Sequence, residues 1–311
     1  MEKYRMNILI TGIHGFVGSN ISKSMNNYTV YGLSTRSSSW DNLNTLPQID
    51  AVIHLAGKAH DTKNKTKSQL YFDINTGLTR EIFDWFLQSS AKKFIFFSSV
   101  KAAADTIDSI LTEDIIPSPC GPYGESKLAA EEYIRNTSLS MSISDKQVYI
   151  IRPCMIHGAG NKGNLNLLYN MIRKGIPWPL GAFENKRSFT SIDNLIYIIH
   201  KLLEKDIPSG IYNVADNEAL STNEIIQIIC ETISCKCNIL NINKKLVMGI
   251  AAFGSVFHFP LNQERLKKLT ENYIVSNEKI KKTLGIDHLP LTAREGLIKT
   301  IHSFESGSIQ G

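Results

Sequence analysis

The sequence lacks abundant cysteine, a secretion signal and any apolar run that could cross a membrane. Its five cysteines are an odd number, and no signal peptide precedes the first apolar segment. A reducing, cytoplasmic location with free thiols is therefore expected. The longest apolar run, residues 246–259, is too short to span a bilayer, so no integral membrane segment is expected. We interpret it as a buried helix or a lid, with contact at a membrane surface as the lesser alternative.

Dense blocks of one charge and groups of metal ligands are also missing. The net charge of +5 is spread along the chain, and no Lys/Arg block is dense enough to indicate a nucleic-acid partner. Cys235 and Cys237 lack the two further ligands that a zinc site requires, so no metal is expected. With 42% hydrophobic and 20% charged residues, the chain is globular and can form one large domain or two joined ones.

What is present is a glycine-rich turn between an apolar strand and a helical pattern. Ile8–Ile10 leads into glycines spaced G-x-x-G-x-x-G, and the helical pattern covers 16–25. The first glycine permits a tight turn, the second lets backbone approach a diphosphate at the helix N-terminus, and the third permits close helix packing. The spacing differs from the usual G-x-G-x-x-G, but its place between strand and helix supports dinucleotide binding. The predicted cradle comprises Gly12, Gly15, Phe16, Val17 and Gly18.

The second strand, 28–33, lacks the acidic residue at its end that often binds the ribose 2′-hydroxyl of NAD. Ser34 stands there, Arg36 follows, and the first carboxylate is Asp41. A guanidinium suits the 2′-phosphate of NADP, so the cofactor is expected to be NADP or NAD, with NADP slightly favoured. The alternative is that Arg36 is a solvated surface charge.

Three further apolar strands, 51–57, 93–100 and 148–153, alternate with helical patterns at 71–89 and 123–137. This alternation predicts an α/β fold, a Rossmann-type doubly wound parallel sheet with ligands at the carboxyl ends of its strands. The residues expected to line the cofactor at these ends are Leu55, Ala56, Gly57 and Pro153. His54 is interpreted as a core histidine with satisfied hydrogen bonds.

The pattern becomes irregular after Pro153, although further helices and a short strand are indicated. Residues 1–155 are predicted to form the dinucleotide-binding domain, completed by about 188–215. Residues 156–187 and 216–311 are predicted to form a smaller lobe that grows out of the sheet and binds the substrate. Within these segments, Asp193 is expected to cap one helix, and Ser221 with Glu224 resembles a capping box.

Three residues combine into a reaction site. Tyr123 and Lys127 share a helix face because they are four residues apart, and Ser99 ends an apolar strand. A nearby ammonium is expected to stabilise the phenolate and to lower the pKa of Tyr123. The tyrosine can then exchange a proton with a carbonyl or alcohol while a nicotinamide exchanges a hydride with the same carbon. A surface ion-pair spacing is the competing interpretation of the Tyr–Lys motif.

These motifs resemble the extended short-chain dehydrogenase/reductases of the NAD-dependent epimerase/dehydratase family. The resemblance runs from Ile8 to about Leu284, and its motifs are Thr11-Gly-Ile-His-Gly-Phe-Val-Gly18, Val52-Ile-His-Leu-Ala56, Phe97-Ser-Ser99, Tyr123-Gly-Glu-Ser-Lys127 and Arg152-Pro153. It implies that Ser99, Tyr123 and Lys127 are catalytic and that Asn75 touches the cofactor. It also implies that Asn164 and Arg187 bind the nucleotide of the substrate.

Within the group, three local stretches resemble the 4-keto reductases that make UDP-N-acetylquinovosamine for surface polysaccharides. They are Gly57-Lys-Ala-His60, Ser99-Val-Lys101, and Lys162-Gly-Asn-Leu165 with Pro179-Leu-Gly-Ala182. The resemblance implies reduction of a UDP-2-acetamido-2,6-dideoxy-4-hexulose, with Ser99, Lys101 and Tyr123 near the sugar. The chain resembles UDP-glucose or UDP-N-acetylglucosamine 4-epimerases with bound NAD nearly as closely. Met155 and His157 stand where those enzymes usually have Asn and Tyr.

Two further implications concern assembly and class. Relatives of this kind pair two helices per subunit, so a homodimer through the helices at 71–89 and 123–137 is expected. A non-catalytic nucleotide-sensing protein of the same fold is the third alternative, and the intact Ser99, Tyr123 and Lys127 argue against it.

Overall fold

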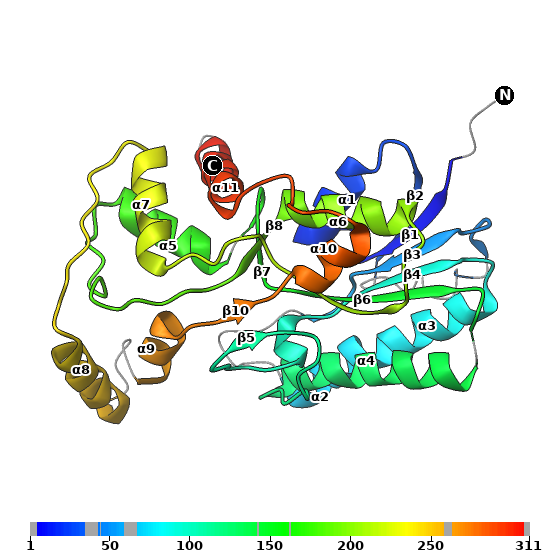
Figure 1. Cartoon of the computed structure of the whole chain (residues 1–311), viewed down its shortest axis with the longest axis horizontal. Helices are drawn as coiled ribbons and strands as arrows, with labels where there is room; N and C mark the ends of the chain where they lie inside the picture. The colour runs from blue at the N-terminus through cyan, green and yellow to red at the C-terminus, as the bar shows by residue number, and fades with distance from the viewer. Residues whose placement is uncertain are drawn as a thin grey trace.

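The computed structural model describes residues 5–34, 43, 45–58, 67–141, 143–161, 163–257 and 263–307. Its centre is a six-stranded parallel sheet with strand order β2-β1-β3-β4-β6-β9 (Figure 1). The strands are β1 (Asn7–Thr11), β2 (Thr29–Leu33), β3 (Ala51–His54), β4 (Lys93–Phe97), β6 (Gln147–Pro153) and β9 (Gly210–Val214). The order turns back at β1, which pairs with β2 on one side and β3 on the other. Ligands bind at such switch points, and the predicted Rossmann-type α/β fold is confirmed.

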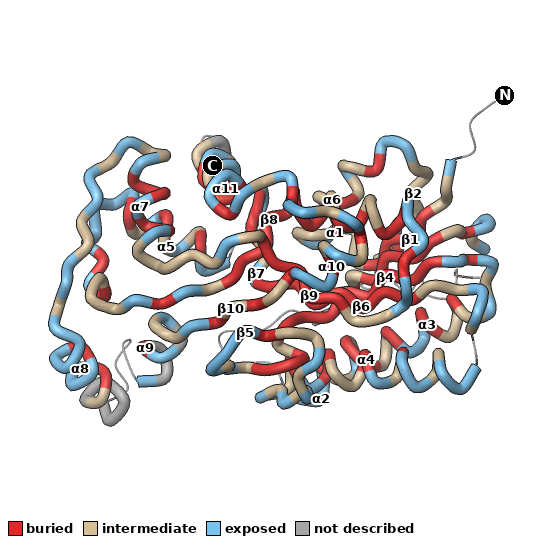
Figure 2. Tube along the Cα trace, viewed as in Figure 1, coloured by how far each residue is buried: buried red, intermediate tan, exposed pale blue. Residues whose placement is uncertain are grey.

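Helices cover both faces of the sheet because successive strand side chains point to opposite faces. Ile8 and Ile10 of β1 pack toward α1 (Phe16–Ser24), α6 (Ile192–Glu204) and α10 (Glu278–Leu284). Leu9 packs toward the opposite layer, formed by α3 (Leu78–Gln88) and α4 (Pro122–Ser140). Figure 2 shows the buried strands between these layers. The carboxyl edge of the sheet is thus built on a core that is apolar on both faces.

The predicted helix at 71–89 is a composite of three elements. It consists of α2 (Ser68–Tyr71), a six-residue π-helix (Phe72–Gly77) and α3. The π-helix contains the buried Asn75, and such wide turns are frequent at functional sites. The predicted strand at 93–100 is shorter, because the chain leaves β4 after Phe97 and forms a 3₁₀ turn over Val100–Ala102.

The second lobe has its own apolar core around α5, α7 and α11. Its elements and the two small sheets beside it are α5 (Asn164–Arg173), α7 (Thr222–Thr232), α8 (Lys244–Phe257), α9 (Gln263–Thr270), α11 (Ala293–Gly307), β5 (Ile110–Leu111) with β10 (Ile274–Val275), and β7 (Met155–His157) with β8 (Phe189–Ser191). The domain bounds given above stay a prediction.

Two helix caps test the capping predictions. The Ser221–Glu224 capping box is confirmed at the start of α7. Asp193 is not a cap: Ser191 precedes α6, and its hydroxyl accepts a hydrogen bond from the Asn194 amide. Asp193 lies in the first turn instead, where its carboxylate still favours the helix dipole.

Most of the long apolar run forms α8, and the interpretation of this run as a buried helix is wrong. Val247 and Ala251 are buried, but Leu246, Met248 and Ile250 are exposed. Within the described residues, no helix combines the length and apolarity needed to cross a membrane.

A buried ion pair joins α4 to β6 beneath the carboxyl edge. Arg152 Nε donates to Glu131 Oε1 over 2.9 Å, and both side chains are 1% exposed. The Ser98 hydroxyl donates to the same carboxylate oxygen. Each charge thus depends on the other for its solvation in the core.

We expect Glu131→Gln to lower the free energy of unfolding by about 3–5 kcal/mol, since it leaves the Arg152 guanidinium buried without its counter-charge. Replacing both partners, as Glu131→Leu with Arg152→Met, should restore most of the loss. Urea unfolding at neutral pH measures both. The control is Asp145→Asn, which removes the exposed pair with Lys92 and should change the free energy of unfolding far less, because solvent screens an exposed pair. Equal losses for the two single variants would contradict this account.

Candidate active site

The N-terminus of α1 forms a cradle suited to a diphosphate. Gly15 is the N-cap, no side chain caps the helix, and its first turn contains no acidic residue. Gly12 has φ +71°, and a Cβ there would lie 2.9 Å from the Ala56 amide nitrogen. The amides of Phe16 and Val17 have no partner within the helix by the geometry of a first turn. The cradle therefore fits an anion that approaches the backbone closely.

The end of β3 is tied to the glycine turn by a chain of buried hydrogen bonds. The Ala56 amide donates to Thr11 Oγ1 over 3.1 Å, and that hydroxyl lies 2.7 Å from His54 Nδ1. His54 Nε2 lies 3.0 Å from Thr79 Oγ1, and Thr79 donates to the Asn75 carbonyl. Burial lowers the pKa of His54 to about 3, so the ring is neutral. The prediction of a core histidine is confirmed.

Asn75, Gly57 and Lys127 meet beside this chain. The Lys58 amide donates to Asn75 Oδ1 over 2.7 Å, and Asn75 Nδ2 donates to Ser126 Oγ over 3.0 Å. A Cβ on Gly57 would lie 2.9 Å from Asn75 Oδ1 and 3.3 Å from Lys127 Nζ. The absence of a side chain at Gly57 therefore leaves the space that a cofactor would need between these groups.

Lys127 is buried between α4 and the sheet. Its Nζ donates to the Phe97 carbonyl over 2.8 Å and lies 5.0 Å from the centre of the Phe96 ring. Burial lowers the pKa of Lys127 to about 8, and the charge of Glu131, one turn further along α4, opposes that shift. The group is therefore an ammonium at neutral pH.

Tyr123 hydrogen-bonds to Ser99, which lies two residues after the end of β4. The pKa of Tyr123 is raised, mainly because its phenol is buried, whereas the bond to Ser99 acts in the opposite direction. The expectation of a lowered pKa for Tyr123 is wrong for this arrangement, because burial of the phenol outweighs the interactions that favour the phenolate. At neutral pH the phenol therefore keeps its proton and can donate it.

Two of the predicted substrate contacts, Lys101 and Arg187, lie beside Tyr273. Lys101 Nζ pairs with Asp105 Oδ1 at 2.9 Å and lies 4.7 Å from the Tyr273 ring centre. Arg187 is half-buried, and its charge acts on the pKa of Tyr273 in the lowering direction, so the two side chains are neighbours. Asn164 is exposed in the first turn of α5.

Two more predicted cofactor residues have clear positions. Leu55 follows β3, and Pro153 ends β6 opposite Val214 of β9, so both stand at carboxyl ends of sheet strands. Arg36 lies outside the described residues. Ser34, the last described residue before it, directly follows β2.

Sequence reasoning missed several polar residues that organise this site. Glu131 continues the helix face of Lys127 at the next i+4 position, a spacing that was visible in the sequence. Ser126 and Tyr273 gave no such signal, because their partners are remote. The Tyr273 hydroxyl donates to the Ala104 carbonyl over 2.7 Å and so holds in place the segment that follows Ser99.

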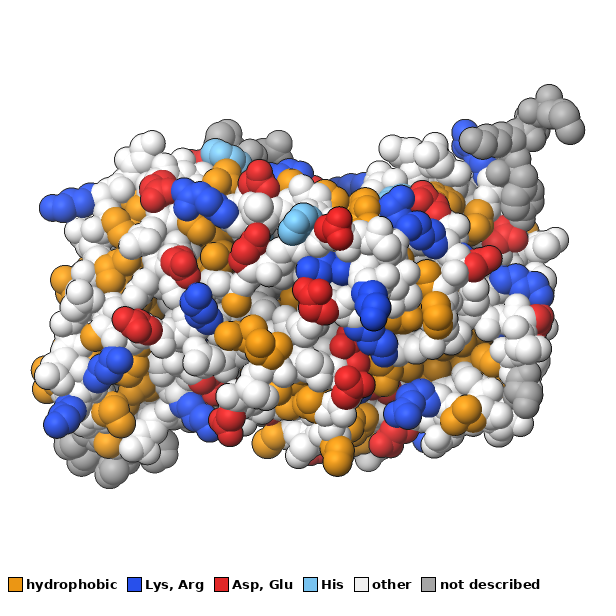
Figure 3. Space-filling view, viewed as in Figure 1, with side chains coloured by type: hydrophobic (Ala, Val, Ile, Leu, Met, Phe, Trp, Pro, Cys, Tyr) orange, Lys and Arg blue, Asp and Glu red, His pale blue; other side chains and the backbone are white. Residues whose placement is uncertain are grey.

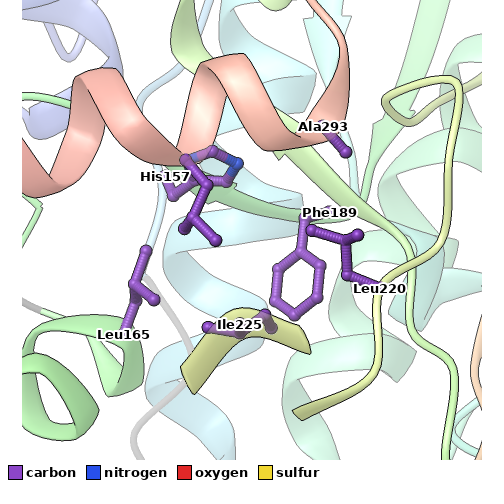
Figure 4. Close-up of a pocket in the computed structure, with 7 residues that line it drawn as sticks. His157, Leu165, Phe189, Leu220, Ile225 and Ala293 are labelled. Atoms are coloured by element: carbon purple, nitrogen blue, oxygen red, sulfur yellow. The ribbon is translucent and has the colours of Figure 1, made fainter. Parts of the chain in front are cut away.

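A separate small cavity lies in the second lobe, about 10 Å³ in volume (Figure 4). It is lined by Leu165, Phe189, Leu220, Ile225, Ala293 and Leu297, with His157 at its edge. This space holds one water at most, so it is a packing gap. In the described ranges, no three His, Cys, Asp or Glu side chains are grouped so as to hold a metal.

A parallel sheet with a glycine cradle and a buried Ser–Tyr–Lys constellation defines an extended short-chain dehydrogenase/reductase, an enzyme class. The sequence model of the NAD dependent epimerase/dehydratase family matches residues 8–215, and the chain belongs to this family.

The relatives include sugar epimerases. The chain is 29% identical to a UDP-glucose 4-epimerase of Vibrio cholerae, with 97% of each chain covered. It is 28% identical to an N-acetyl-alpha-D-glucosaminyl-diphospho-ditrans,octacis-undecaprenol 4-epimerase of Escherichia coli O157:H7, over 89% of this chain and 85% of the relative.

Solved structures share the fold. RMD from Pseudomonas aeruginosa, complexed with NADPH, superposes with a TM-score of 0.74 at 19% identity. UDP-glucuronic acid 4-epimerase from Bacillus cereus, in complex with NAD, superposes with a TM-score of 0.75 at 20% identity. Each comparison covers 97% of this chain and 99% of the other.

We expect Tyr123→Phe to reduce turnover by a factor of about 10²–10⁴, because it removes the proton donor and keeps the ring. The measurement is kcat on a sugar that wild type converts. Tyr133→Phe is the control, since that phenol donates to Asp84 of α3 and should leave kcat unchanged. A Tyr123→Phe enzyme with near-normal kcat would refute the assignment.

The pH dependence should report on Lys127. With a pKa of about 8, the ammonium is present below that value and is lost as the pH rises through it. We expect kcat/KM to fall on the alkaline side of pH 8, because a neutral amine no longer stabilises the phenolate of Tyr123. The fall should be absent from the residual activity of Lys127→Met. An alkaline limb that persists in that variant would contradict the assignment.

Proposed function

We propose that this enzyme is an NAD(P)-dependent oxidoreductase acting at C4 of a UDP-sugar. The favoured reaction is reduction of a UDP-2-acetamido-2,6-dideoxy-4-hexulose in surface-polysaccharide biosynthesis. The observation that carries the proposal is the buried group of Ser99, Tyr123 and Lys127 beside the glycine cradle. A cytoplasmic homodimer through α3 and α4 remains part of this prediction.

In this proposal Ser99 donates a hydrogen bond to the sugar's C4 carbonyl oxygen and holds it beside Tyr123. The nicotinamide supplies a hydride to C4 when it is bound. Tyr123 donates its proton to the oxygen, and the buried ammonium of Lys127 stabilises the phenolate that remains. Gly12, Gly15 and Gly18 hold the cofactor diphosphate, and Asn75 keeps the Lys58 loop in place.

Arg187 and Asn164 are proposed to bind the nucleotide of the substrate. The planar guanidinium of Arg187 suits a diphosphate through paired hydrogen bonds. Lys101 is proposed to approach the sugar. Because its ammonium already pairs with Asp105, such an approach requires that pair to open, so Lys101 is the weakest member of the set.

The second candidate is a 4-epimerase that keeps its NAD bound and returns the hydride. The relatives from Vibrio cholerae and Escherichia coli favour it, since both are 4-epimerases. The residue after β2 favours the reductase, because Ser34 supplies no carboxylate for the ribose 2′-hydroxyl of NAD.

Cofactor preference can be tested at this position. We expect wild type to bind NADPH more tightly than NADH, and Ser34→Asp with Arg36→Ala to reverse the order by about tenfold or more. The physical reason is that a carboxylate accepts from a 2′-hydroxyl and repels a 2′-phosphate. Dissociation constants measured by fluorescence titration decide it. Arg135→Ala, at an exposed arginine of α4, is the control. A wild-type preference for NADH would remove the argument for NADP.

The reaction is tested by following NADPH absorbance with UDP-2-acetamido-2,6-dideoxy-4-hexulose. We expect one NADPH consumed for each sugar reduced. UDP-glucose and UDP-N-acetylglucosamine are incubated in parallel without added cofactor. Interconversion of their gluco and galacto forms, with no NADPH consumption in the first assay, would replace the reductase with the 4-epimerase.

A further inference from the structure

Helix α8 presents large apolar side chains to the surface of the second lobe. Leu246, Met248 and Ile250 are 59%, 57% and 52% exposed, whereas Val247 and Ala251 are buried against the lobe. A Cβ on Gly249 would meet nothing within 4 Å. Over residues 246–251, therefore, one side of the helix packs against the lobe, and these three apolar side chains contribute little to that packing.

The same part of the chain carries the excess of positive charge. Residues 232–270 contain six Lys or Arg and one Glu, whereas the other 272 residues contain 28 basic and 28 acidic residues. The net charge of +5 is thus concentrated here, which corrects the view that it is spread along the chain. Lys244 and Lys245 begin α8, and Lys267 lies on α9; all three are exposed. No charged residue occurs over 246–257.

This charged and apolar surface lies at one end of the molecule. α8 and α9 stand beside one another at the tip of the second lobe, away from the central sheet (Figure 1). In the space-filling view, hydrophobic and basic side chains are mixed at that end (Figure 3, lower left). Docking there leaves the carboxyl edge of the sheet open.

We propose that α8 binds the surface of an anionic lipid membrane. Its apolar side chains enter the boundary between headgroups and acyl chains, and Lys244, Lys245 and Lys267 contact lipid phosphates. Amphipathic helices with basic flanks bind membranes in this way, lying in the plane of the surface. The proposal concerns where the enzyme works and does not depend on which sugar it converts.

The length and charge of α8 favour binding to a membrane surface over two other arrangements, in which α8 crosses a membrane or pairs with a second copy of the chain. A helix of 14 residues is about 21 Å long, shorter than the hydrocarbon core of about 30 Å, so α8 lies on a membrane and does not cross it. Pairing of two copies through α8 would bring two segments of net charge +5 together, which is unfavourable. An anionic surface matches both the apolar and the basic residues.

The test is flotation of the full chain with vesicles of equal parts phosphatidylcholine and phosphatidylglycerol, and with vesicles of phosphatidylcholine alone. We expect wild type to float with the anionic vesicles. Leu246→Ser with Met248→Ser and Ile250→Ser should reduce the bound fraction by about a hundredfold. Lys244→Gln with Lys245→Gln should reduce it by about tenfold and weaken its salt dependence.

The matched control replaces three exposed apolar residues elsewhere, Ile116→Ser, Leu139→Ser and Leu167→Ser, which are 90%, 76% and 68% exposed. It should bind vesicles like wild type. Thermal melting and NADPH binding, both measured without lipid, show that each variant is folded. A folded α8 variant that floats like wild type overturns the proposal, and so does wild type that stays unbound. Dimerisation that depends on α8 in the absence of vesicle binding would assign the surface to a second copy instead.

Discussion

The site depends on the interactions of one lysine ammonium, which is buried between α4 and the sheet. Lys127 Nζ donates to the Phe97 carbonyl at the end of β4 and lies near the face of Phe96. Burial pulls the pKa of this group down, and Glu131 counteracts it. Glu131 in turn is held by Arg152 of β6. The charge at the site thus rests on a chain of buried partners that joins one helix to two strands.

The cofactor side of the site is organised by space and by neutral hydrogen bonds. The glycine turn leaves backbone exposed to an anion, and the Thr11–His54–Thr79 chain connects that turn to the π-helix carrying Asn75. Because His54 is neutral over the physiological pH range, this connection does not respond to pH there. The Lys127 group is the part of the site whose charge changes near pH 8.

The sequence predicted the features that depend on local pattern. Apolar runs predicted the parallel strands, and the capping box at Ser221 was confirmed because its four residues are contiguous. The π-helix at 72–77 was missed, because the apolar residues in this part of the sequence repeat at ordinary helical spacing. The pKa of Tyr123 was predicted in the wrong direction, because a spacing of four residues says nothing about desolvation by the surrounding fold. The exposure of α8 was missed for a similar reason: an apolar composition resembles a core helix whether or not the fold covers it.

We propose that this site moves a hydride between a nicotinamide and C4 of a sugar. The most direct measurement uses NADPH carrying deuterium at the transferred position of the nicotinamide, with the 4-keto UDP-sugar as substrate. Mass and NMR spectra of the product locate the label. The account predicts one deuterium, bound to C4, formed by wild type and not by Tyr123→Phe. Product without deuterium, or deuterium at another carbon, would contradict it.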